Sequence, residues 1–434
     1  MLSIASLAPV LQTLFTSQAD RLAHSTGFVR RRRRFSGSQF LQALVLGWLR
    51  RPQAPLETLA LPLDVSRQAL HQRFDDHAAA FCRAALLEGV AQAVQARPEA
   101  LPLLERFSAV YLDDTTQAWL PDALAERFAG CGSGRPGQAK ARLKLFLRWE
   151  VLGGRVCHLG LHPGRAADVT AADGAAALPA GALRLADLAF ADFDALEALS
   201  RRGVFWITRV PAQARLHPDG KPSVPLAGQL RAWRRAGVRR AELACRLGNK
   251  SSAHGRLVAL RCPQEVSGRR LQRLGAEARR RNRSVSARQR ELCYWTVYFS
   301  NVPAEWLTAE QVWLVARLRW QIELLFKRLK SEGGLGVSRS EQPQRVECEW
   351  YLKLLGQLVR LWLTLLRGGP LIDVNPRARG AVATDALAGV FAALGSESAV
   401  AAVLADVSQQ LGRVRRRTRR RTRKTLRDLL SNAA

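Results

Sequence analysis

The chain of 434 residues has few cysteines, and none of them is spaced as in a zinc site or a redox centre. The seven cysteines are scattered, at positions 82, 131, 157, 245, 262, 293 and 348. No two have the C-x-x-C spacing, and although His158 and His162 lie near Cys157, a second ligand pair is missing. Isolated cysteines are typical of a reducing compartment, so we expect a cytoplasmic protein.

Long uncharged apolar runs are also missing from the sequence. The most apolar later segment, residues 351–366, carries Lys353 and Arg360 and is too short to span a bilayer. The first fifteen residues have no early basic stretch and no cleavage site of the kind that marks a signal peptide. The sequence therefore predicts a protein that is neither membrane-spanning nor exported.

Acidic residues are scarce relative to basic ones. The chain has 67 Lys and Arg against 36 Asp and Glu, a formal net charge of +31. So large an excess repels itself unless a polyanion offsets it, and a compositional bias toward arginine explains only part of it. Nucleic acid is the first expected partner and an anionic membrane surface the second.

Residues 1–105 have the pattern of a helical region. Residues 55–74 predict a short helix, a turn at Pro62 and a second helix with Ser66 as its N-cap. This arrangement resembles a helix-turn-helix, whose second helix would enter a DNA groove, while an ordinary helical hairpin is an equal alternative. That helix carries Arg67, Gln68, His71 and Arg73. The five arginines 30–34 are expected to contact phosphates.

From residue 106 the pattern changes to that of an α/β protein. Residues 141–164 predict a hairpin turning at Gly153 and Gly154, and strands at 181–190 and 204–210 flank a helix over 191–203. This alternation indicates a mixed sheet. Residues 211–290 are expected to form a β-rich basic insertion in which 268–290 is helical. Residues 291–345 are expected to return to the core, 346–410 to be helical and 411–434 to be a basic tail.

One helix places a single acid among bases. Thr308 and Gln311 have capping-box spacing, so a continuous helix is predicted from 309. At about 100° per residue, Glu323 lies on one face with Arg319, Lys327 and Lys330, beside an apolar flank formed by Leu318, Ile322, Leu325 and Leu329. Pairing of Glu323 with Arg319 and Lys327 would explain this pattern at a few tenths of a kcal/mol each.

Further acids stand at the ends of two predicted strands and suggest a second explanation. Asp113 and Asp114 lie in the first strand of the core, and Asp187 ends the strand over 181–190. Two Mg²⁺ ions about 3.5–4 Å apart need bridging and terminal carboxylates, and Mg²⁺ prefers oxygen ligands. Glu323 would complete such a set, with the neighbouring bases holding phosphates.

Residues 316–330 resemble the signature of the DDE transposases of the insertion sequence four family, relatives of the transposon five enzyme. The signature is Tyr, two residues, Arg, three residues, Glu, six residues, Lys. Ala316, Arg319, Glu323 and Lys330 match it except at the first place, where loss of the Tyr should weaken DNA-end binding. The segments "DTTQAWLP", "ADLAF" and "SNVP" follow the family's order, so the resemblance spans roughly residues 35–370.

The resemblance implies an RNase H-like mixed-sheet core, interrupted by a mostly β insertion, whose catalytic residues and metal ligands are Asp114, Asp187 and Glu323. They would hold two Mg²⁺ ions, for which Mn²⁺ could substitute. Asp113 competes with Asp114, but strand alternation puts the two on opposite faces. Asp187 could instead cap the next helix. The implied DNA contacts are Arg319, Lys327, Lys330 and Trp295, and this Trp would stack a flipped base or, alternatively, be a core residue.

The function implied by the resemblance is cut-and-paste transposition of an insertion sequence. The protein would bind terminal inverted repeats of double-stranded DNA, pair the ends as a homodimer, cleave one strand, form a hairpin and join the 3′ ends to target DNA. It would work at the nucleoid of a bacterial cytoplasm. A metal-dependent nuclease on the same core, and a DNA-binding relative without catalysis, are the alternatives.

Overall fold

The computed structural model describes residues 2–31, 34–98, 100–131, 140–172, 175–248, 252–336, 338, 340–368, 376–414 and 426–433. It divides into two compact units, each built from several chain segments. The first unit comprises Met1–Glu99, Asp114–Ala176 and Gln321–Arg423, and the second comprises Ala100–Asp113, Ala177–Trp320 and Lys424–Ala434. Helices and ten strands among the described residues confirm the predicted mixed α/β class.

The first unit begins with helices, as the sequence predicts for this region. These are α1 (Ile4–Phe15), α2 (Ser17–Ser25), α3 (Gly37–Arg50), α4 (Leu56–Ala60), α5 (Arg67–Gln72) and α6 (Asp76–Ala91). Phe28, Phe40, Phe74 and Phe81 pack ring against ring between them. Gly37 lets α3 approach α2 closely, because a Cβ there would lie 2.3 Å from that of Ala23.

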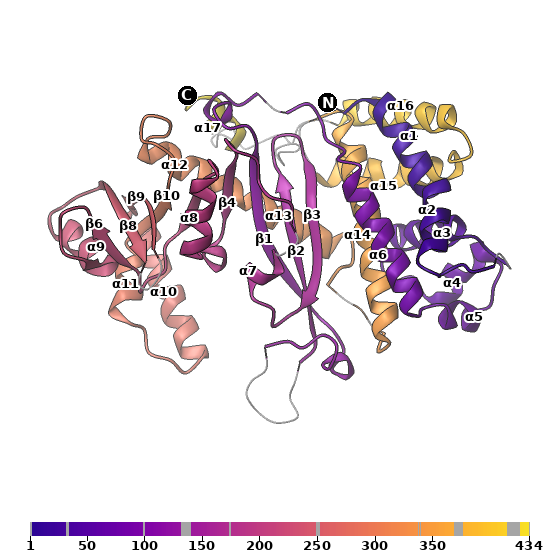
Figure 1. Ribbon diagram of the computed structural model, residues 1–434, viewed down its shortest axis with the longest axis horizontal. Helices are drawn as coiled ribbons and strands as arrows, with labels where there is room; N and C mark the ends of the chain where they lie inside the picture. The colour runs from indigo at the N-terminus through magenta and orange to yellow at the C-terminus, as the bar shows by residue number, and fades with distance from the viewer. Residues whose placement is uncertain are drawn as a thin grey trace. The chain divides into compact units, whose positions relative to one another are not determined.

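Helices from late in the chain pack against these early helices within the same unit. They are α14 (Pro343–Leu365), α15 (Pro376–Ala392) and α16 (Glu397–Arg413). Helix α14 lies beside α6 and α3, and α16 lies beside α1 and α15 (Figure 1). Within the described segments, no helix is both long and apolar enough to cross a membrane.

A β-hairpin forms the sheet of the first unit. Strands β2 (Arg142–Glu150) and β3 (Arg155–Pro163) pair antiparallel, from Leu143 opposite Pro163 to Glu150 opposite Arg155. The chain turns at Gly153 and Gly154, as predicted, and Gly154 has the positive φ of 79° that favours glycine. The strand order is β3-β2-β1, with β1 spanning Val110–Trp119 and belonging to this unit from Asp114 on. The short helix α7 (Asp168–Ala171) follows β3.

The second unit contains a mixed sheet that includes the first residues of β1. Strands β1, β4 (Leu183–Ala186) and β5 (Phe205–Arg209) run parallel, and helix α8 (Phe193–Arg201) connects β4 to β5. Gly203 ends this connection with a φ of 70°, as the sequence predicts for a helix C-terminus. Strand β10 (Trp295–Ser300) then pairs antiparallel with β5 and with β9 (Ser252–Arg261).

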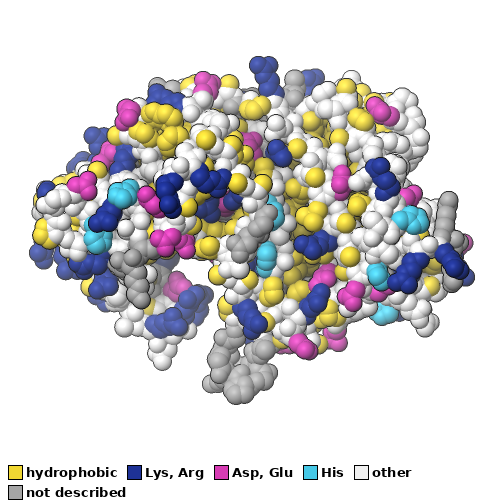
Figure 2. Space-filling view, in the orientation of Figure 1, with side chains coloured by type: hydrophobic (Ala, Val, Ile, Leu, Met, Phe, Trp, Pro, Cys, Tyr) yellow, Lys and Arg dark blue, Asp and Glu magenta, His cyan; other side chains and the backbone are white. Residues whose placement is uncertain are grey.

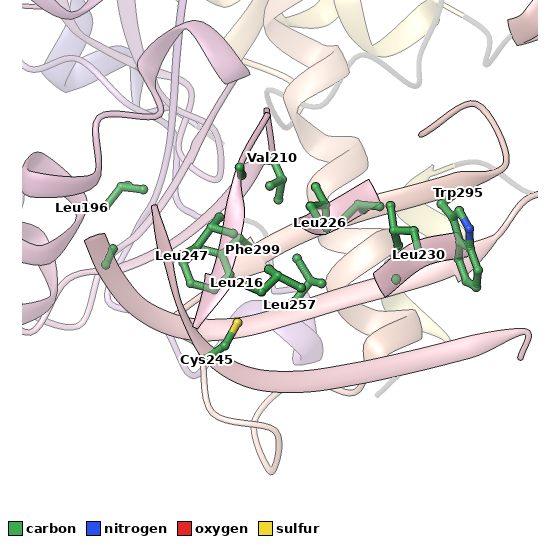
Figure 3. Packing of buried hydrophobic residues seen from close by; sticks show 14 of the residues in the cluster. Leu196, Val210, Leu216, Leu226, Leu230, Cys245, Leu247, Leu257, Trp295 and Phe299 are labelled. Atoms are coloured by element: carbon green, nitrogen blue, oxygen red, sulfur yellow. The ribbon is translucent and has the colours of Figure 1, made fainter. Parts of the chain in front are cut away.

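The predicted insertion over 211–290 contains strands and also substantial helix. Its strands are β6 (Arg215–Pro218), β7 (Val224–Pro225), β8 (Arg240–Gly248) and β9. Its helices are α9 (Leu226–Arg235), α10 (Gln264–Arg280) and α11 (Ala287–Leu292). The insertion shares a buried core with β10, shown in Figure 3, which includes Leu216, Leu257, Trp295 and Phe299. Apolar side chains from β6, β8, β9 and β10 meet there, which explains why short and otherwise basic strands hold together.

The helix that was predicted to run unbroken from 309 is interrupted. Its start is confirmed, because the Thr308 side chain accepts a hydrogen bond from the amide of Gln311 in a capping box. Helix α12 (Ala309–Ala316) then ends, a turn of 3₁₀-helix covers Arg317–Arg319, and α13 spans Trp320–Ser331. The predicted apolar flank is confirmed, since Leu318, Ile322, Leu325 and Leu329 are buried.

The basic tail lies partly outside the described residues. Residues 415–425 are among those that are not described. Beyond them, α17 covers Leu426–Ser431 in the second unit, and its Leu430 is buried.

Candidate active site

Asp113 is buried in the core of the second unit. Its carboxylate is fully buried, at 0% exposure, and its Oδ2 lies 2.8 Å from Nε of Arg184. Arg184 is itself buried and lies on the adjacent strand β4, whose register places Asp113 opposite Ala186. A buried carboxylate paired in this way is satisfied within the protein. This supports Asp114 rather than Asp113 as the functional acid.

Asp114 and Asp187 both come directly after the last register pair of two parallel strands. That pair is Asp113 and Ala186, and the preceding pair is Leu112 and Leu185. The backbone of Asp187 is still extended, with φ −79° and ψ 172°. Because side chains alternate along a strand, Asp114 follows the face of Leu112 and Asp187 follows the face of Leu185. Each acid therefore continues the face of one leucine of a register pair.

Asp187 does not cap the helix that follows it. The N-cap of α8 is Asp192, whose side chain accepts from the amide of Ala195 at 3.0 Å. Among the described residues, Asp187 precedes only a turn of 3₁₀-helix (Leu188–Phe190), and its side chain makes no capping hydrogen bond there. The half-buried carboxylate of Asp187 has no helix-capping role that would explain its presence at the strand end.

The residue after Asp114 is held by a network within the first unit. The amide of Thr115 donates to Oδ1 of Asp114 at 2.8 Å, and the Thr115 hydroxyl donates to Oδ1 of Asp168 at 2.9 Å. Nζ of Lys144 lies 2.6 Å from the same Asp168 oxygen. Sequence reasoning missed Thr115, Lys144 and Asp168. The available signal was Lys144, a charged residue between the apolar residues Leu143 and Leu145 of β2.

Helix α13 carries Glu323 and is tied to β1 by its last turn. Nζ of Lys330 donates to the backbone oxygen of Gln117 at 2.8 Å, within the first unit. Glu323 lies seven residues earlier, which puts it about 20° from Lys330 around the helix and so on the same face. Asp114 lies three residues before Gln117 on the strand. Burial of the Lys330 ammonium lowers its pKa.

The other bases of the motif differ in exposure. Arg319 is half-buried in the 3₁₀ turn, which packs against β4 within the second unit, whereas Lys327 is exposed on α13. Ala316, where the resembling family has Tyr, is buried at the end of α12. The motif therefore offers one exposed and two half-buried cations, Lys327, Arg319 and Lys330, along a single segment.

The candidate ligands form an all-oxygen donor set. Asp114 and Glu323 belong to the first unit and Asp187 to the second, and all three carboxylates are half-buried. Carboxylates without His or Cys suit Mg²⁺ or Mn²⁺ and not the thiolate and imidazole chemistry of zinc. Among the described residues no group of three or more His, Cys, Asp or Glu side chains is gathered as around a metal ion, Cys157 with His158 and His162 included.

Trp295 lies in the core of the second unit, which is the alternative that the sequence left open for it. The side chain is 2% exposed and packs in the cluster of Figure 3. Its indole Nε1 is buried and has no hydrogen-bond partner in the described part of the chain. The ring also borders a cavity of about 490 Å³ together with Arg209, Arg270 and Arg273. At this exposure the ring presents little surface to a DNA base.

The helix-turn-helix predicted near the N-terminus forms as α4, a 3₁₀ turn (Leu61–Leu63) and α5. Ser66 caps α5, as predicted, by accepting from the amide of Ala69 at 3.1 Å. Arg67 is exposed on α5 and lies 3.1 Å from a carboxylate oxygen of Glu57. Arg73 instead turns inward and donates to the backbone oxygen of Phe28 at 2.7 Å.

A cavity that the sequence did not predict adjoins α5. It has a volume of about 1070 Å³ and is bordered by the residues before α3 and by the starts of α5 and α6. The guanidinium of Arg73 stacks over the ring of Phe28 at 4.5 Å and near that of Phe35 at 5.7 Å. Three further arginines line the cavity, Arg30, Arg31 and Arg34. Aromatic residues on either side of the arginine run were the available signal.

Acids directly after two parallel strands and a Glu among bases on α13 are the residue types that phosphoryl transfer with divalent metal ions uses. A family model described as "Transposase DDE domain" matches residues 110–357, more than half of the chain. The chain belongs to this family of DDE transposases, and the resemblance seen in the sequence is confirmed.

Similar proteins agree with the family assignment. The transposase for insertion sequence element IS231F of Bacillus thuringiensis subsp. israelensis is 25% identical over 367 residues, 77% of this chain and 75% of that protein. The transposase for IS1151 of Clostridium perfringens is 22% identical over 388 residues, 83% and 80%. The putative transposase InsL for IS186A of Escherichia coli (strain K12) is 35% identical over 136 residues, 31% and 36%.

Proposed function

We propose that this chain is the cut-and-paste transposase of an insertion sequence. It binds the terminal inverted repeats of its element, cleaves one strand, and uses the freed 3′-OH to form a hairpin on the other strand. After the hairpin reopens, the 3′ ends join target DNA. The observation that carries the proposal is that Asp114 and Asp187 directly follow the last register pair of β1 and β4, while the neighbouring Asp113 is paired with Arg184.

Asp114, Asp187 and Glu323 would hold two Mg²⁺ ions, or Mn²⁺ in their place. When bound, the ions activate the attacking water and stabilise the leaving 3′ oxygen. Two separate contacts support Glu323 as the third ligand. The 3₁₀ turn before α13 packs on β4, and Lys330 in the last turn of α13 donates to a backbone oxygen of β1. Arg319, Lys327 and Lys330 would bind the phosphates beside the cut.

The proposed architecture is an RNase H-like core made of residues 106–210 and 291–345, with 211–290 as its insertion. The insertion is strongly basic, and Figure 2 shows Lys and Arg side chains gathered over α9 and α10. The exposed arginines of α10 include Arg269, Arg273, Arg279 and Arg280. They would contact DNA phosphates, and residues 346–410 would contribute to a homodimer that pairs two ends.

The N-terminal region, residues 1–105, would bind the repeat sequence. Exposed Arg67 on α5 can reach base edges in a groove, while Arg73 and the other arginines of the adjoining cavity can bind the backbone. Asp75 also lines the cavity, but its side chain already accepts from the amide of Ala78 at 2.8 Å as the N-cap of α6. The lining therefore keeps a positive charge that favours phosphate.

The experiment that tests the proposal is cleavage of a DNA duplex carrying the element's terminal repeat, with Mg²⁺ present and absent. A transposase gives nicked, hairpin and strand-transfer products in sequence, all dependent on the metal. A metal-dependent nuclease gives hydrolysis without hairpin or joined products. A DNA-binding protein without catalysis binds the duplex and cuts nothing, with or without Mg²⁺.

A further inference from the structure

Lys144 is a buried lysine near the start of β2 in the first unit's hairpin. Its side chain is 6% exposed, and apart from Arg142 every residue of β2 is buried. Burying an ammonium is costly unless it is paired and hydrogen-bonded. Nζ of Lys144 meets both needs, because it lies 2.6 Å from Oδ1 of Asp168 and also donates to the backbone oxygen of Ala166.

Asp168 uses the same oxygen to hold Thr115. The Thr115 hydroxyl donates to Oδ1 of Asp168 at 2.9 Å, so this oxygen accepts from the lysine and from the hydroxyl together. A carboxylate paired with a lysine only accepts hydrogen bonds, which fixes the direction of the bond from Thr115. The buried pair therefore fixes the side-chain rotamer of Thr115.

Thr115 connects this pair to Asp114 through its backbone. Alternation along β1 directs the Thr115 side chain to the face opposite that of Asp114. The Thr115 amide nevertheless donates to Oδ1 of Asp114 at 2.8 Å. An anchor on one face of the strand therefore orients a carboxylate on the other face, and all four residues belong to the first unit.

We propose that Thr115, anchored by the Lys144–Asp168 pair, is a positioning residue that orients the carboxylate of Asp114 for divalent metal binding. This rests on the proposed function, in which Asp114 is a metal ligand. Partners that orient a ligand from outside the coordination shell typically contribute about 10–100-fold to metal affinity. Without its anchor, Thr115 lets Asp114 turn away from the orientation that the ions need.

The test compares T115V, which removes only the hydroxyl, with T115S, which keeps it. T384V is the control, because the Thr384 hydroxyl in α15 also donates a hydrogen bond, here to the backbone oxygen of Gly380 at 2.8 Å, far along the chain from β1. Mn²⁺ binding to each full-length protein is followed by electron paramagnetic resonance. The Mg²⁺ concentration for half-maximal end cleavage and the melting temperature are measured alongside.

T115V should bind Mn²⁺ about tenfold more weakly and need about tenfold more Mg²⁺, yet approach the wild-type rate when Mg²⁺ saturates. T115S should restore both values, and T384V should leave both unchanged. Mn²⁺ binding and Mg²⁺ demand at wild-type values in T115V would overturn the proposal. So would a loss in T115V that tracks a lower melting temperature and does not recover at saturating Mg²⁺.

D114N separates failure of this proposal from failure of the proposed function. If D114N loses cleavage and Mn²⁺ binding while T115V behaves as wild type, Asp114 is a ligand and the positioning role alone is overturned. If D114N binds Mn²⁺ and cleaves as the wild type does, Asp114 is not a ligand and both proposals are overturned.

Discussion

Two networks of charged residues adjoin β1. The neighbouring residues Asp113 and Asp114 differ in the burial of their carboxylates and in the partners of these carboxylates. Asp113 is fully buried and paired with Arg184, whereas Asp114 is half-buried and its backbone neighbour Thr115 is held by Asp168 and Lys144. In the first network an arginine satisfies the acid directly. In the second, the lysine satisfies Asp168 and leaves Asp114 oriented by an amide. We propose that the first acid stabilises the fold and that the second takes part in the chemistry.

The largest expected effect is on catalysis. D114N, D187N and E323Q should each lower the rate of end cleavage by about a thousandfold or more, because each removes a charge that the metal ions need. Each should keep the melting temperature within about 3 °C of the wild type, since these acids are half-buried. Cleavage assays and calorimetry measure the two quantities. Wild-type cleavage by D114N would reverse the roles that we assign to the two networks.

The next effect is on stability. D113N leaves Arg184 buried without its charge partner and should lower the free energy of unfolding by about 3–5 kcal/mol, as broken buried pairs do. Urea denaturation measures this loss. The double variant D113L/R184M removes both charges and should recover most of the stability. An equal loss in D113N and D114N would mean that the networks do not differ as proposed.

Arginines also differ in whether an acid pairs with them, and this difference predicts a smaller effect, on the salt dependence of DNA binding. Arg184 is occupied by Asp113, whereas Arg31 and Arg34 line the N-terminal cavity. The variant R31A/R34A should lower the slope of log affinity for DNA against log salt concentration by about 0.9 for each phosphate that is no longer neutralised. Arg83, exposed on α6 and outside the cavity lining, provides the control variant R83A. Equal slopes in the two variants would show that the cavity is not part of the DNA-binding surface.

The smallest expected effect is on the pH dependence of stability and concerns Lys330. This lysine donates to a backbone carbonyl, whereas Lys144 pairs with a carboxylate. Burial lowers the pKa of Lys330, so the unfolded chain holds this proton to higher pH than the folded chain does. The lysine therefore opposes folding while it is protonated, and stability rises with pH between the folded and the ordinary pKa. Relative to K330M, the wild type should gain slightly in free energy of unfolding, measured by urea denaturation, between pH 8 and 10. A relative loss over this range would contradict the assignment.

Local signals in the sequence predicted much of the fold. The hairpin at Gly153 and Gly154, the capping box at Thr308 and the cap at Ser66 all formed, because each depends on residues a few positions apart. The interruption of the helix at Arg317–Arg319 was not predicted, because the apolar residues before and after it keep the same helical spacing. Within 211–290, the helix predicted over 268–290 formed as α10 and α11, whereas α9 was not predicted because its polar, arginine-rich face obscures its apolar side.

The candidate site was predictable in part and for a similar reason. Strand alternation separated Asp113 from Asp114, but only the register with β4 supplied Arg184 as the partner that satisfies Asp113. The support of Thr115 by Asp168 could not be found from sequence, because the two residues are 53 positions apart and meet only when the hairpin folds. Contacts of this range depend on tertiary packing, which a local pattern does not encode.

The most direct test of the central claim replaces each proposed metal ligand by cysteine and compares metals. D114C, D187C and E323C should lose end cleavage in Mg²⁺, which binds thiolate poorly, and regain part of it in Mn²⁺, which accepts sulfur more readily. Recovery in all three would place Asp114, Asp187 and Glu323 on the ions. Cleavage that is unchanged in Mg²⁺, or abolished equally with both metals in all three variants, would contradict the account.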